Sequence, residues 1–174
     1  MPFFQSSTVA RSGNFTTLTS SSETLTANIA TATLSIFRVT GSVKVLRLFG
    51  VVTTTLVGQN HTGAWFRFYD QTLNRALTLE AGAPALSNFG VGSTIERTAL
   101  AATIATVKQS SNAQITESAA AGDLVNCEFD LVAKNGANSD IQYTYSTTDA
   151  PTSGVIQFFC EWRATSADGA VAAV

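Results

Sequence analysis

The stretch that decides the fold is Val39-Thr-Gly-Ser-Val-Lys-Val-Leu-Arg-Leu-Phe-Gly-Val-Val-Thr-Thr-Thr-Leu56, a run of apolar and β-branched residues with two glycines. β-Branched side chains favour strands over helices because one face of a pleated sheet accommodates them well. The run is long enough to bend at Gly50, where we expect a bulge or a close backbone approach. It predicts a long scaffold strand in a β-protein.

Composition supports the same fold class. Hydrophobic residues make up 45% of the 174 residues and charged residues only 13%, so Ser and Thr must cover much of the solvated surface. Exposed helix faces normally carry Glu, Lys and Arg, whereas Thr suits strands. A weakly charged surface also repels its own copies little, and we therefore expect a homo-oligomer.

Charge and hydropathy exclude several partners. The formal net charge of -2 argues against a nucleic-acid partner, which requires a basic surface. The first residues lack the pattern of a signal peptide, and no stretch reaches the ~18 apolar residues of a membrane span. We expect folding in the cytosol, no membrane partner, and reduced thiols at Cys127 and Cys160.

Alternating patterns predict further strands. Residues 64–70 and 75–80 resemble an antiparallel hairpin that follows a loop at residues 58–63. Residues 81–122 fit both helical and strand periods, and the context favours strands and loops. Alternation places four sets of residues each on one face of a strand: Phe66 and Phe68; Cys127, Phe129 and Leu131, opposite an acidic outer face; Ile141, Tyr143 and Tyr145; and Ile156, Phe158, Cys160 and Trp162.

About seven strands or more indicate an all-β fold, an antiparallel β-sandwich that we expect to be jelly-roll-like, although sandwich and jelly-roll connectivities leave similar patterns and the strand order stays open. We assign residues 23–174 to a single β-sandwich domain. Residues 1–22 are rich in Ser and Thr and lack periodicity, which predicts an extended N-terminal arm. Such an arm can clasp a neighbouring subunit or remain disordered.

Few residues carry reactive chemistry. His61 lies in the Gly-bounded loop with no ligand beside it, which favours a solvated histidine over catalysis. Cys127 and Cys160 fall on apolar strand faces and favour core packing over metal binding. Glu128 and Asp130, with Asp123 and Asp140, could hold Ca²⁺ or act on a sugar, but a solvated strand face is favoured. We therefore expect no enzyme activity and no cofactor.

Aromatic residues are candidates for binding. Trp65, Tyr69, Tyr143 and Tyr145 could stack on a glycan or on a partner protein, although burial in the core or in a subunit interface is favoured.

Two segments carry a resemblance. The run from Val39 to Leu56 resembles an early segment of small virion structural proteins of tailed bacteriophages. The end of the chain, Ala150-Pro-Thr-Ser-Gly-Val-Ile-Gln-Phe-Phe-Cys-Glu-Trp-Arg-Ala-Thr-Ser-Ala-Asp-Gly-Ala-Val-Ala-Ala-Val174, resembles the closing strand and tail of the same group. Together they cover about a quarter of the chain, and neither contains a functional signature.

The resemblance implies a capsid decoration (cement) protein, assembled in the host cytoplasm and located in the virion. Such proteins typically form trimers and bridge major capsid protein subunits. The candidate partner contacts are Phe3, Phe4, Trp65, Tyr69, Ala170, Val171 and Val174. The alternative is a carbohydrate-binding or receptor-binding module of a phage tail or fibre that uses Trp65 and Tyr69. A glycosidase built on Glu128 and Asp130 is the third hypothesis.

Overall fold

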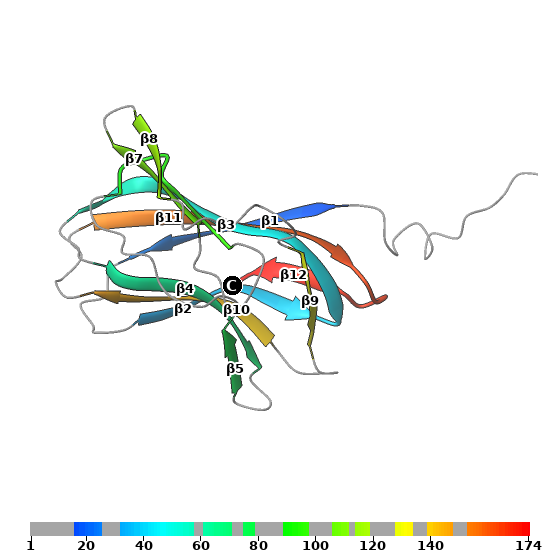
Figure 1. Ribbon diagram of the computed structural model, residues 1–174. Helices are drawn as coiled ribbons and strands as arrows, with labels where there is room; N and C mark the ends of the chain where they lie inside the picture. The colour runs from blue at the N-terminus through cyan, green and yellow to red at the C-terminus, as the bar shows by residue number, and fades with distance from the viewer. Residues whose placement is uncertain are drawn as a thin grey trace, which may run out of the picture.

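Two antiparallel sheets form the protein (Figure 1). The structure, a computed structural model, describes residues 16–25, 32–57, 61–70, 75–78, 89–97, 106–111, 114–118, 128–133, 139–147 and 153–174. Sheet A contains β1 (Thr17–Thr24), β11 (Ser153–Ala164), β3 (Ser42–Val57), β6 (Thr94–Glu96), β7 (Thr106–Ser111) and β8 (Gln114–Ser118), with β9 (Phe129–Val132) also paired to β3. Sheet B contains β12 (Ala170–Ala173), β2 (Ala32–Thr40), β10 (Ser139–Thr147), β4 (His61–Asp70) and β5 (Arg75–Thr78).

Eight of these strands have jelly-roll connectivity. The pairs β1–β11, β2–β10, β3–β6 and β4–β5 are those of one long hairpin folded at the connection between β4 and β5. Rolling that hairpin onto itself adds the pairs β3–β11 and β4–β10. The resulting orders are β1-β11-β3-β6 in one sheet and β2-β10-β4-β5 in the other. The predicted antiparallel β-sandwich is confirmed, and its strand order, which the sequence left open, is that of a jelly roll.

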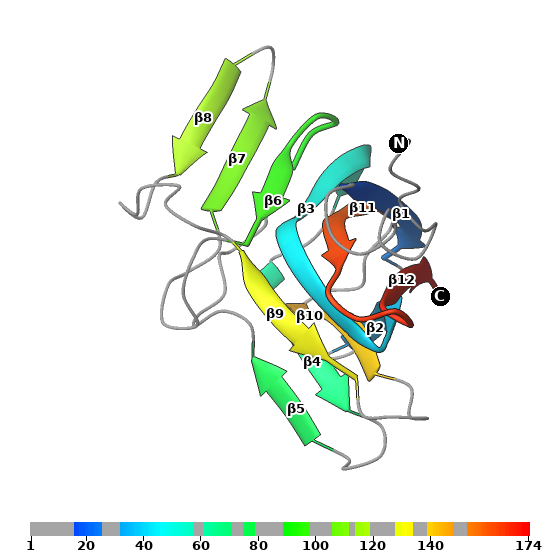
Figure 2. The ribbon, with the colours of Figure 1, turned by 90° about the vertical axis from the view of Figure 1, so that its right-hand side faces the viewer.

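The remaining strands extend this frame. β7 and β8 continue sheet A past β6 and away from sheet B (Figure 2). β9 pairs with the first residues of β3. β12 pairs with β2 at the edge of sheet B. The strand preference within residues 81–122 holds for β6, β7 and β8, and the other residues of that stretch lie outside the described part of the chain.

The long strand β3 organises sheet A, since β11, β6 and β9 all pair with it. Gly50 lies opposite Phe158 within a regular part of this pairing. A Cβ atom at Gly50 would stand 2.8 Å from Cγ2 of Ile156 and 3.0 Å from the Phe158 ring. Glycine is therefore needed because the Phe158 ring approaches the backbone, and the close approach predicted at this position is confirmed.

An aromatic cluster joins the two sheets. Phe66 and Tyr143 come from sheet B and Phe158 from sheet A, and all three are fully buried. The Phe158 ring centroid lies 4.8 Å from that of Tyr143 and 6.0 Å from that of Phe66, the latter edge-on. Burying each such ring stabilises the fold by roughly 2–3 kcal/mol, and aromatic pairing adds about 1 kcal/mol. The residues that were predicted to share a strand face in β4, β10 and β11 do share one, and the structure shows that these faces are buried.

Hydrogen bonds close one side of the sandwich, where β1 and β12 meet. The indole Nε1–H of Trp162 donates to Oγ1 of Thr19 at 3.0 Å, and that hydroxyl donates to the Val171 carbonyl at 3.1 Å. Three strands from two sheets are thus connected through one threonine. The buried indole N–H finds a partner, as a buried polar group requires.

Two boundaries predicted from the sequence were wrong. Residues 17–22, assigned to the arm, belong to β1, which pairs with β11 along its whole length. This edge strand shows no apolar pattern because only Ser21 of its residues is buried and backbone hydrogen bonds hold it in place. His61, assigned to a loop, begins β4. Residues 1–15, with Phe3 and Phe4, lie outside the described residues.

Gly41 makes the sharp corner between β2 in sheet B and β3 in sheet A. Its φ of 57° lies in the left-handed region, and an added Cβ would meet Oδ1 of Asp168 at 2.5 Å. The turn from Thr165 to Gly169 holds this corner: the Ser166 hydroxyl accepts from the Ser42 amide at 2.8 Å and donates to Asp168.

We expect Gly41→Ala to lower the free energy of unfolding by about 2 kcal/mol, because alanine adds both backbone strain and a clash with Asp168. Urea unfolding followed by tryptophan fluorescence measures the change. Thr165→Ala, an exposed substitution in the adjoining turn, is the control and should change the value by less than about 0.5 kcal/mol. Equal stability of Gly41→Ala and wild type would contradict this account of the corner.

Candidate interaction surface

The structure places Cys160 in the core. Its side chain is fully buried between the sheets, and burial, with a smaller contribution from Glu161, raises the pKa of the thiol from 9.0 to about 12. Cys160 is thus a protonated core residue, as predicted, and Cys127 lies outside the described residues. Within the described ranges, no three His, Cys, Asp or Glu side chains gather as a metal site.

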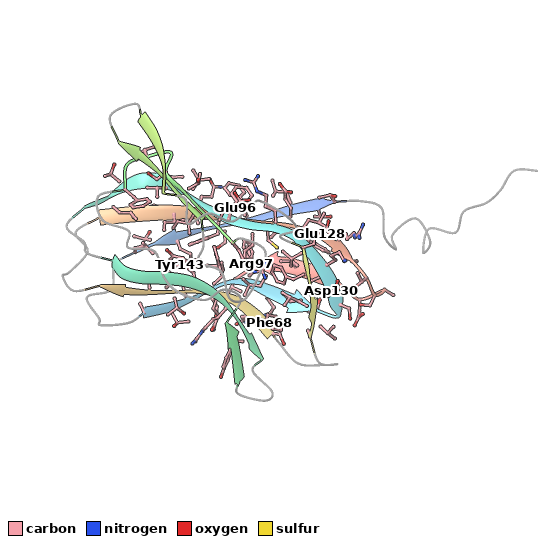
Figure 3. All side chains as sticks on the ribbon, viewed as in Figure 1. Phe68, Glu96, Arg97, Glu128, Asp130 and Tyr143 are labelled. Atoms are coloured by element: carbon pink, nitrogen blue, oxygen red, sulfur yellow. The ribbon has the colours of Figure 1, made fainter. Side chains whose placement is uncertain are left out.

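The predicted acidic residues do not form one site. Glu128 and Asp130 are exposed beside β9 (Figure 3), and Lys44 lies between them at 3.7 Å and 3.9 Å. Asp140 belongs to the other sheet and pairs with Arg38, while Asp123 falls outside the described residues. Glu128 and Asp130 therefore form a solvated ion-pair network with Lys44, the arrangement favoured from the sequence.

The predicted aromatic residues separate into two groups. Tyr143 and Tyr145 are buried in the core, and Figure 3 shows Tyr143 between the two layers. They offer no surface to a ligand. Tyr69 is half-buried on the outer face of sheet B, where the Arg67 guanidinium lies 5.9 Å from its ring centroid. Trp65 lies opposite Thr144 in the β4–β10 pairing, and its side chain is outside the described part.

The C-terminal tail required a correction. Residues 170–173 form β12, whose alternation turns Val171 toward the core, where it is 6% exposed. Val171 therefore does not offer a partner contact. Ala170 and Val174 are exposed and remain candidates.

The outer face of sheet A carries a surface that the sequence did not reveal. Where β1, β11 and β3 form this face beyond Arg47, the described outward positions carry no ionisable side chain, and we call this part the neutral face. Its residues are Ser20, Ser22 and Thr24 of β1, Val155, Gln157 and Phe159 of β11, Phe49 and Val51 of β3, and Thr94 of β6.

An aromatic pair lies on β3 and β11 in the row of the neutral face that is nearest to its charged border. Phe49 lies directly opposite Phe159, and their rings stack at 5.0 Å between centroids with 17° between planes. The Arg47 guanidinium lies 4.3 Å from the Phe49 ring centroid and forms a bidentate pair with Glu96, with its Nη2 at 2.9 Å from Oε2. Phe49 and Phe159 are both partly exposed. In the sequence, this pair is indicated only by an aromatic residue at an outward-facing position of β3 and of β11.

Charges border the neutral face at one end of the sheet. Successive outward rows contain Arg47 with Glu161, and then Lys44 with Arg163 and Asp130. Charge is thus concentrated over the β9 end of sheet A, while the opposite end is apolar and hydroxyl-bearing. Such a division is typical of an interface with an uncharged centre and a polar rim.

No family model matches this chain, and no curated protein or solved structure matches it either. In the described part of the chain, no helix has the length and hydropathy needed to cross a membrane.

We expect Cys160 in a Cys127→Ala variant to resist iodoacetamide at pH 8 in the native state and to react fully in urea, because the native thiol stays protonated. The unfolded thiol ionises from pH 9, whereas the native one ionises only near 12. Stability should therefore fall as pH rises between these values, by up to about 1.4 kcal/mol per pH unit relative to Cys160→Ala. Rapid native labelling would contradict the buried position.

Proposed function

We propose that this chain is a non-enzymatic structural protein of a bacteriophage virion, a capsid decoration protein that forms a homotrimer and bridges major capsid protein subunits. The neutral face carries the proposal, because its outward positions on β1, β11 and β3 have no ionisable side chain and so lose little solvation energy when another protein covers them. The resemblance of residues 39–56 and 150–174 to phage virion proteins supports the virion as the proposed location.

The chemistry of the neutral face suits protein contact better than sugar stacking. A sugar ring stacks on an aromatic face that points to solvent, but Phe159 and the Arg47 guanidinium already lie against the Phe49 ring. The stacked pair instead forms a ridge of apolar surface. Val51 and Val155 extend the ridge in the direction away from the charged border. A complementary protein surface can pack against it without burying an unpaired charge, because Arg47 beside Phe49 is paired with Glu96.

The charged border would orient the contact. Arg47, held by Glu96, and the neighbouring Glu161 present both signs at the edge of the neutral face. Exposed charges of this kind contribute little affinity but penalise wrong registers. In a trimer the neutral face of one subunit meets a different surface of the next, because a threefold interface is heterologous.

We expect wild-type protein to have the mass of a trimer in light scattering at several concentrations, and Phe159→Asp to have the mass of a folded monomer. The carboxylate would be desolvated at the centre of the interface, whereas in the monomer it meets water. Circular dichroism checks that the variant is folded.

Val132→Asp is the matched control, since Val132 is an apolar residue of β9 that is 66% exposed and lies outside the neutral face. It should remain a trimer. A concentration-independent wild-type monomer, or a trimer that survives Phe159→Asp, would contradict the proposed interface.

Binding to the shell is tested separately. We expect the protein to co-sediment with shells of the major capsid protein of the same virion, and deletion of residues 2–15 to weaken that binding at least tenfold. The deletion removes Phe3 and Phe4 but stops before β1, so the thermal unfolding midpoint should not change. Unchanged shell binding by the truncated protein would remove the arm from the proposal, and no binding by wild type would refute decoration.

A further inference from the structure

The outer face of sheet B contains a row of polar side chains that are buried. Asp140, Gln142 and Thr144 alternate along β10 with core residues and should face solvent, yet they are 2%, 8% and 1% exposed. β10 is the middle strand between β2 and β4, and side chains from both neighbours cover it. A buried polar row on an outer face is costly unless every group is paired.

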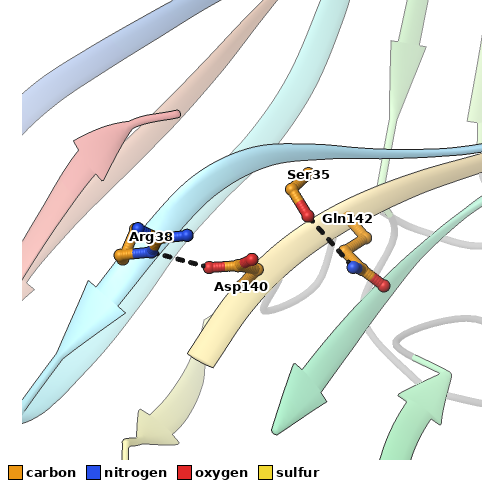
Figure 4. Close-up of polar contacts among 4 residues, drawn as sticks. All are labelled: Ser35, Arg38, Asp140 and Gln142. Atoms are coloured by element: carbon orange, nitrogen blue, oxygen red, sulfur yellow. Dashed lines mark hydrogen bonds and ion pairs between the residues drawn. The ribbon is translucent and has the colours of Figure 1, made fainter. Parts of the chain in front are cut away.

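Two arginines pair with Asp140 and Gln142 of this row, and Figure 4 shows one of them, Arg38. Nε of Arg38 donates to Oδ1 of Asp140 at 3.1 Å. Nε of Arg67 donates to Oε1 of Gln142 at 2.7 Å, and Nε2 of Gln142 donates to the Ser35 hydroxyl at 3.0 Å. Each arginine is therefore held by its inner nitrogen to a buried group. Because each side chain is already held in place, it loses less conformational entropy when it binds a ligand.

The outer nitrogens of both arginines remain available. Among the described residues, no hydrogen bond uses Nη1 or Nη2 of Arg38 or Arg67, and each pair of Nη groups provides four N–H donors. The Arg38 side chain is 38% exposed. Two guanidiniums and one carboxylate leave this part of the face positive, on a chain whose net charge is -2.

The spacing of the arginines indicates an extended anion. Arg38 lies on β2 in the row of Asp140, and Arg67 lies on β4 in the row of Gln142. Two strand spacings and two residues separate their Cα atoms by about 12 Å. A small anion is too short to contact both anchored guanidiniums at once. A polymer with repeating acidic groups can place one charge at each arginine, so it fits this spacing better.

We propose that this surface, the arginine face (Arg38, Arg67, Asp140, Gln142 and Tyr69), binds the carboxylates of an acidic polysaccharide. The planar guanidinium presents a fork of donors that matches a carboxylate. Tyr69 beside Arg67 and the hydroxyl of Ser35 add the aromatic and hydroxyl groups that sugars contact. The proposal does not depend on the decoration role, because the arginine face and the neutral face lie on opposite sides of the sandwich.

The experiment measures binding to three soluble acidic polysaccharides, hyaluronan, alginate and polysialic acid, by biolayer interferometry at low salt. Carboxyl-reduced hyaluronan, which keeps the sugar chain without the charge, and neutral dextran are the ligand controls. We expect wild type to bind at least one acidic polymer and neither control. Binding should weaken as salt rises, because ion pairs on an exposed face are screened.

Arg67→Gln is the first variant. Its partner Gln142 is neutral, so no buried charge is left unpaired and the fold should persist. We expect at least a tenfold loss of affinity. Arg163→Gln on sheet A removes the same charge from the opposite side of the sandwich and should bind like wild type. Arg38→Lys keeps a cation beside Asp140 but lacks the fork, and should lose affinity several-fold.

Three outcomes would overturn the proposal. The first is no binding of any acidic polysaccharide by folded wild type. The second is an equal loss of affinity in Arg67→Gln and Arg163→Gln, which would mean that net charge alone drives binding. The third is tighter binding to poly-glutamate than to every polysaccharide, which would point to an acidic protein partner instead.

Discussion

The packing of Phe158 against Tyr143 and Phe66 is the contact on which the rest of the structure depends. It joins the middle of sheet A to the middle of sheet B, and it exists only because Gly50 leaves room for the Phe158 ring. Once these rings are buried, the inward residues of every central strand are fixed, since alternation places each second side chain in the core. The outward residues then form the neutral face and the arginine face.

Those two surfaces differ in chemistry because their central strands differ. On sheet A the outward positions of β3 and β11 carry Phe49 and Phe159, which cover each other and leave a neutral surface. On sheet B the outward positions of β10 carry Asp140 and Gln142, which must be paired and so draw arginines from β2 and β4. One sandwich thus presents a neutral face, for which we propose a protein contact, and an arginine face, for which we propose anion binding.

Much of the fold could be predicted from local pattern. Alternating apolar residues in β4, β10 and β11 identified the inward faces, and the long run through Gly50 identified the scaffold strand. Apolar alternation did not identify the strands that are held mainly by backbone hydrogen bonds. Thr17–Thr24 has no apolar period because it is a sheet edge, and the small residues of β12 gave no sign that Val171 completes the core.

The sequence by itself determined the class of fold, because the period of two along the strands decides which side chains can be buried together. It also determined that few reactive groups would be present. Only the tertiary structure decided the surfaces. Ser35 and Arg38 are three residues apart, a spacing that points to opposite faces, but the register shift beside Ile36 and Phe37 places both on the outer face against β10. No local pattern encodes that shift, because it is set by the pairing of β2 with a strand about a hundred residues away.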